Sequence, residues 1–72
     1  MRTYRVDAPC PELGRVLERL IKEVGVGEAA AIRSKWRYIA NDVANIAKMI
    51  GLDVISIADE AGDVVVTVVR RR

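Results

Sequence analysis

The first half of the chain alternates between a strand pattern and a helix pattern. Residues 3–7 alternate polar and apolar, with Tyr4 and Val6 on one face, which predicts a half-buried strand. Residues 13–24 carry apolar side chains at helical spacing and charged side chains on the opposite face, so we expect an amphipathic helix. Gly25 follows at the position where helices commonly end. Residues 29–34 form a short apolar run that predicts a buried strand.

The second half of the chain predicts one more helix and a hairpin. The helix pattern starts at residue 38 or 41 and runs to residue 50, and Gly51 is expected to end it. Residues 53–58 and 64–69 are rich in β-branched side chains, which favour strands. The Gly-containing segment 59–63 separates them and indicates a hairpin loop.

The predicted order is therefore β-α-β-α-β-β. It indicates the α/β class: a two-layer sandwich in which two helices cover one face of a four-stranded mixed sheet. Right-handed crossovers make the first two strands parallel, so the loops that follow them lie at the same edge of the sheet. With 72 residues and no internal linker, residues 1–72 are expected to form a single domain.

Composition excludes several kinds of site. The chain has one cysteine and no histidine, so it cannot form an internal disulfide, a four-cysteine zinc site, a Cys-His pair or a Ser-His-Asp triad. We expect no metal and no cofactor. The net charge is only +2, from 12 basic and 10 acidic residues, which does not indicate a nucleic acid as partner.

The single cysteine, Cys10, lies between Pro9 and Pro11 at the predicted start of the first helix. Proline suits the first helical position, and a helix start offers unpaired N–H groups and the positive end of the helix dipole. This environment favours a thiolate, so Cys10 is a candidate nucleophile. The alternative is that Cys10 is a small apolar side chain of the core.

Several segments are similar to one known family. A strand, then Cys10-Pro11-Glu12-Leu13 opening an amphipathic helix, then β-α-β-β, resembles the TusA/SirA-like sulfur carrier family, whose hallmark is Cys-Pro-x-Pro at the first helix. The resemblance continues at residues 26–28, 41–43 and 50–54 and covers nearly the whole chain. Leu13 stands in place of the second proline, and residues 35–38 differ from the family's acidic loop.

The resemblance implies a sulfurtransferase of the relay type. Cys10 would hold sulfane sulfur as a persulfide between a sulfur-donor protein and a sulfur-acceptor protein. The pathway stays open among tRNA thiolation, cofactor synthesis and sulfur oxidation. Beside Cys10, we expect a docking or substrate-steering patch made by Arg33, Lys35, Trp36 and Arg37.

Two other functions are compatible with this sequence. The first is a non-catalytic RNA- or protein-binding module on the same fold, with residues 35–38 as a stacking and phosphate platform. The second is an accessory subunit whose cysteine has no role. Apolar side chains on both faces of the last two strands predict an exposed patch, and with it a homodimer; the residues are Ile55, Ile57, Val65 and Val69.

Location is predicted from what the sequence lacks. No apolar run reaches the roughly 20 residues of a membrane span, and the first residues have no signal-peptide core. Together with a free thiol, this predicts a cytoplasmic protein without a membrane partner. The last three arginines, residues 70–72, are expected to form a solvated tail.

Overall fold

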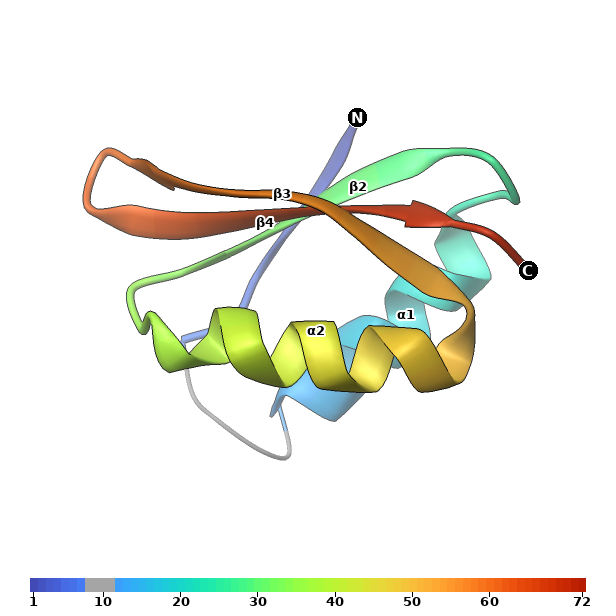
Figure 1. Cartoon of the computed structure of the whole chain (residues 1–72), viewed down its shortest axis with the longest axis horizontal. Coiled ribbons are helices and arrows are strands. Elements are labelled where there is room, and N and C mark those ends of the chain that lie inside the picture. The colour runs from blue at the N-terminus through green and yellow to red at the C-terminus, as the bar shows by residue number, and fades with distance from the viewer. Residues whose placement is uncertain (8–11) are drawn as a thin grey trace.

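The computed structural model describes residues 1–7 and 12–72 of the chain, and it confirms the predicted fold class. Both helices lie on one face of a four-stranded mixed sheet (Figure 1). The elements, in chain order, are β1 (Arg2–Arg5), α1 (Glu12–Glu23), β2 (Ala29–Ser34), α2 (Tyr38–Ile50), β3 (Leu52–Glu60) and β4 (Asp63–Arg70). The expected helix start at residue 38, rather than 41, is the correct one.

The strands are ordered β1-β2-β4-β3 across the sheet. β1 pairs parallel with β2, as the crossover argument requires, and β4 runs antiparallel to both of its neighbours. β1 and β3 are consequently the two edge strands. The register places Tyr4 opposite Ile32 and Arg5 opposite Arg33, so alternate residues of β1 and β2 share a face.

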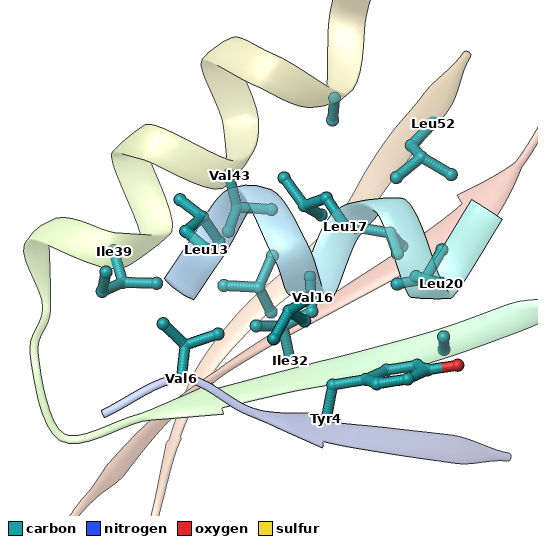
Figure 2. Close-up of a cluster of buried hydrophobic side chains, with 14 of the residues drawn as sticks. Tyr4, Val6, Leu13, Val16, Leu17, Leu20, Ile32, Ile39, Val43 and Leu52 are labelled. Carbon is teal, nitrogen blue, oxygen red and sulfur yellow. The ribbon is translucent and has the colours of Figure 1, made fainter. Parts of the chain in front are cut away.

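The core lies between the sheet and the two helices, where apolar side chains from every element meet (Figure 2). Leu13 in the first turn of α1 is fully buried, although its position in the sequence places it only at the edge of the buried face. The largest fully buried apolar side chains are those of Val6, Leu13, Leu20, Ile32, Ile39, Val43, Val66 and Val68.

The hairpin between β3 and β4 is tighter than the sequence predicts. Glu60 pairs with Asp63, so the turn consists of only two residues, Ala61 and Gly62. Both have positive φ, 52° and 83°, which is the type I′ geometry that matches the twist of the flanking strands. Gly62 adopts this conformation easily, whereas Ala61 is strained in it. The longer loop expected over residues 59–63 is therefore wrong.

The C-terminal arginines are more ordered than a solvated tail. Arg70 belongs to β4, and its guanidinium donates hydrogen bonds to the backbone oxygens of Ile21 and Val24 at the end of α1. Arg71 pairs with Asp53. The sequence prediction is wrong for Arg70, because its guanidinium caps a helix that lies 46 or more positions earlier in the chain, whereas Arg71 and Arg72 are exposed and lie beyond β4.

The expected apolar patch on the last two strands is divided between the two faces of the sheet. Ile57 pairs with Val66, whose side chain points to the helices, whereas Val65 and Val69 point to the opposite face. Val65 is only 7% exposed, while Ile55 and Ile57 are about half exposed on the edge strand. A register shift between Val54 and Ser56 separates the two halves of β3. Neither α1 nor α2 is long and apolar enough to span a membrane.

Candidate functional site

The predicted nucleophile, Cys10, lies outside the described residues, so the site is built from the residues on either side of it. Asp7 is the last described residue before Cys10, and Glu12 is the first after it. The indole N–H of Trp36 donates to the backbone oxygen of Asp7 at 3.0 Å. The backbone N–H of Asp7 donates to a carboxylate oxygen of Glu12 at 3.2 Å. The end of β1, the start of α1 and the β2–α2 loop thus meet at one end of the sheet.

The β2–α2 loop is shaped by its own hydrogen bonds. Ser34, the last residue of β2, is fully buried, and its hydroxyl oxygen accepts from the backbone N–H of Trp36 at 3.1 Å. The backbone N–H groups of Ile39 and Ala40 then bond three residues back, to Trp36 and Arg37. This tight first turn starts α2 without a side-chain cap. Asp42, the first acidic residue of α2, lies beyond this first turn.

Trp36 and Tyr38 present two aromatic rings to the surface. Their side chains are 47% and 45% exposed, and their ring centroids lie 6.2 Å apart. Exposed aromatic side chains of this size are enriched where proteins contact partners. The docking patch expected beside Cys10 therefore includes one exposed aromatic side chain, that of Trp36, and the exposed ring of Tyr38 lies next to it.

The two predicted arginines are held by carboxylates. Arg37 pairs with Asp59 of β3, which raises the pKa of Arg37 by hydrogen bonding. Arg33 pairs with Glu60 and Asp63 on the sheet face that the helices leave open, away from the loop. Lys35 forms no salt bridge with any described residue. Within the predicted patch, Lys35 and Trp36 are thus the side chains most available to a partner.

Asp63 is the centre of an ion-pair cluster that the sequence does not reveal. Its carboxylate accepts two hydrogen bonds from Arg5, at 2.9 and 3.2 Å, and a third from Arg33 at 3.3 Å. The bonds from Arg5 lower the pKa of Asp63, against an opposing effect of burial. Arg5 also holds Asp7 at 3.0 Å. The cluster therefore fixes the last residues of β1, directly before the segment that contains Cys10.

The described residues hold no group of three or more acidic, histidine or cysteine side chains that could bind a metal ion. Two surface depressions of about 500 and 340 Å³ lie along β1 and the C-terminal half of α1 rather than at the Lys35–Tyr38 loop. What the described residues of the site offer is accordingly a surface with two exposed aromatic rings and one lysine.

Comparison with known proteins adds no family to this description. No protein-family model matches the chain, and no curated protein is significantly similar to it.

Proposed function

We propose that this protein is a cytoplasmic sulfur carrier that holds sulfane sulfur as a persulfide on Cys10 and passes it to an acceptor protein. The observation that carries the proposal is the run Cys10-Pro11-Glu12 leading into α1, which begins at Glu12. The β-α-β-α-β-β order, which the resemblance to TusA/SirA-like sulfur carriers implies, supports it.

The proposed reaction is an exchange at sulfur. The Cys10 thiolate attacks the outer sulfur of a persulfide on the donor protein, a new S–S bond forms, and the donor's own S–S bond breaks. The donor leaves as a thiolate, so no oxidant or reductant is consumed. An acceptor nucleophile later attacks the same outer sulfur and releases Cys10 as a thiolate. The chain has no second cysteine that could resolve the persulfide as an internal disulfide.

The residues around the β1–α1 junction supply positioning and docking. The start of α1 favours an anionic sulfur nearby because of its unpaired N–H groups. Glu12 limits this effect, since its carboxylate lies in the same first turn. Trp36 holds the end of β1 and still exposes about half of its surface, and Lys35 has no ion-pair partner among the residues described. We propose that Trp36 and Lys35 contact the donor and acceptor proteins, and that Arg33 and Arg37 contribute mainly through their carboxylate partners.

Intact mass spectrometry tests the proposal. After incubation with a protein persulfide donor, the wild type should gain one sulfur atom, roughly +32 Da, and the Cys10→Ser variant should gain nothing while remaining folded. Trp36→Ala and Lys35→Ala should load more slowly from a protein donor and at the wild-type rate from a small persulfide. Met49→Ala, which removes an exposed side chain on α2, is the matched control. A wild type that never loads would rule out the carrier function.

A second function, a binding module for single-stranded RNA, is favoured by one observation. The Trp36 and Tyr38 rings are both about half exposed and lie 6.2 Å apart, an arrangement on which bases can stack. An RNA shift that weakens with salt and is lost in Trp36→Ala, in a protein that does not accept sulfur, would support this alternative.

The homodimer expected through the sheet remains a prediction. Ile55 and Ile57 on the β3 edge are its exposed apolar candidates. Analytical ultracentrifugation of the wild type and of Ile57→Lys would test it: the wild type should sediment as a dimer and the variant as a monomer.

A further inference from the structure

One edge of the sheet, the outer side of β1, offers backbone groups to a partner. Among the strands that the structure describes, β1 pairs with β2 alone. The backbone N–H of Val6 donates to the backbone oxygen of Arg33, so the backbone N–H and C=O groups of Val6 point toward β2. The direction of these backbone groups alternates along a parallel ladder. The N–H and C=O groups of Tyr4 therefore also point toward β2, and those of Thr3 and Arg5 point away from it, to the open side of the edge strand.

Beyond the end of β1, both backbone groups of Asp7 are already used. The N–H of Asp7 donates to Glu12, and its C=O accepts from Trp36. The edge is thus closed at its C-terminal end by two side chains. No described residue makes a backbone hydrogen bond to the outward groups of Thr3 and Arg5. The N-terminal part of β1 is therefore an available strand edge.

A groove runs beside this edge. It has a volume of about 340 Å³ and is lined by Arg2–Arg5 together with Val16, Arg19 and Glu23 of α1. It adjoins a second depression of about 500 Å³ with which it shares Arg2 and Glu23. The floor is ordered: the Tyr4 hydroxyl donates to Glu23 at 2.7 Å, and Figure 2 shows the Tyr4 ring lying alongside α1.

The groove carries positive charge on its α1 side. The Arg19 guanidinium lies 5.8 Å from the centre of the Tyr4 ring. Glu23 is its only described ion-pair partner, at 3.9 Å, and it also accepts from the Tyr4 hydroxyl. Arg2 forms no salt bridge within residues 1–7 and 12–72. Arg2 and Arg19 thus line the groove together with a single carboxylate, that of Glu23, which leaves a net positive charge beside the strand edge.

From this geometry, we propose that the β1 edge binds an extended acidic segment of another protein, which adds to the sheet as a fifth strand. The backbone of the segment would hydrogen-bond to Thr3 and Arg5. Every second side chain of the segment would face α1, where carboxylates would pair with Arg2 and Arg19. The opposite face of the segment would lie beside Arg5, whose guanidinium Asp7 and Asp63 already neutralise. The expected ligand is therefore a segment with acidic residues at alternate positions.

Two synthetic peptides test this inference on the full chain: acetyl-Glu-Val-Glu-Val-Glu-Val-amide and its counterpart with lysine in place of each glutamate. In ¹⁵N-NMR titrations, the acidic peptide should shift the amides of Thr3 and Arg5 and protect them from hydrogen exchange, and the lysine peptide should not. Arg19→Glu should weaken binding of the acidic peptide at least tenfold. Lys48→Glu, the same charge change on the exposed side of α2, should leave it unchanged.

A backbone variant separates strand addition from simple charge attraction. Thr3→Pro removes one outward N–H without removing a bond to β2, and proline is tolerated at such edge positions. It should abolish the exchange protection at Arg5. The proposal is wrong if both peptides bind alike, if Arg19→Glu binds like the wild type, or if the shifts map to another surface. Concentration-dependent protection of Thr3 and Arg5 without peptide would instead identify a second copy of this chain as the occupant and overturn it.

Discussion

Replacing Arg70 should destabilise the fold far more than replacing its neighbour Arg71. The Arg70 guanidinium donates to two backbone oxygens at the C-terminal end of α1, one of them at 2.7 Å. Those oxygens have no partner within the helix, and they carry the negative end of its dipole. Arg70→Met keeps the length of the aliphatic side chain and removes both bonds.

The expected cost follows from the surroundings of each arginine. A hydrogen bond from a charged group contributes about 1.5–3 kcal/mol, and partial exposure of Arg70 lets water replace some of it. We therefore expect about 2 kcal/mol for the two bonds together, or a fall in Tm of roughly 8–16 °C for a domain of this size. Arg71 pairs with Asp53 with both side chains 58% exposed, a pair worth at most about 1 kcal/mol.

Urea denaturation followed by circular dichroism measures both variants. Arg70→Met and Arg71→Met change the net charge equally, so the difference between their free energies of unfolding reports mainly the helix-capping bonds. The other bond lost with Arg70, from its Nε to the backbone oxygen of Arg72, is exposed to water. Arg70→Lys restores the charge with a different donor geometry and should recover part of the loss. Equal destabilisation by Arg70→Met and Arg71→Met would refute the reasoning.

Three further predictions concern other parts of the fold. Ala61→Asn should stabilise the protein by about 0.5–1 kcal/mol, because Asn-Gly suits the type I′ turn; a lower Tm would contradict this. Leu13→Ala and Leu13→Pro should each cost about 2–3 kcal/mol, since Leu13 is fully buried; a far larger loss for proline alone would show that the backbone there rejects it. The lowered pKa of Asp63 means that its contribution to stability is complete above its ordinary pKa, about 4, and is lost as the pH falls through the lower folded value. The difference in urea midpoint between wild type and Asp63→Asn should therefore shrink from pH 7 to pH 2; a constant difference would contradict it.

The sequence predicts those features that depend on local pattern. Residues 29–34 are assigned correctly because this short, mostly apolar run between turn signals is compatible with a buried strand and is too short for a typical helix. The meeting of the β1–α1 and β2–α2 junctions follows from parallel pairing, and the bond from Trp36 to Asp7 agrees with it.

Features that depend on long-range contacts could not be predicted in the same way. Arg70 resembles a tail residue until the end of α1 is known to lie beside it. The Asp63 cluster requires the register that places Arg5 opposite Arg33, and no spacing in the sequence gives that register. The burial of Leu13 depends on the rotation of α1 about its own axis relative to the sheet, which is set by packing between elements. At the candidate site, Arg33 and Arg37 form salt bridges with carboxylates of β3 and β4. These strands come later in the chain, and the sequence does not show that they lie beside the two arginines.

The most direct test of the sulfur-carrier function is whether the mass gained at Cys10 can leave again. A persulfide and a sulfinic acid both add roughly 32 Da to a cysteine, but only the persulfide is released by a thiol reductant. Tandem mass spectrometry of the peptide containing Cys10, before and after reductant, distinguishes them. We predict that the adduct lies on Cys10 and that reductant returns the peptide to its original mass with release of one equivalent of sulfide. An adduct that persists, or that lies elsewhere, would contradict the proposed function.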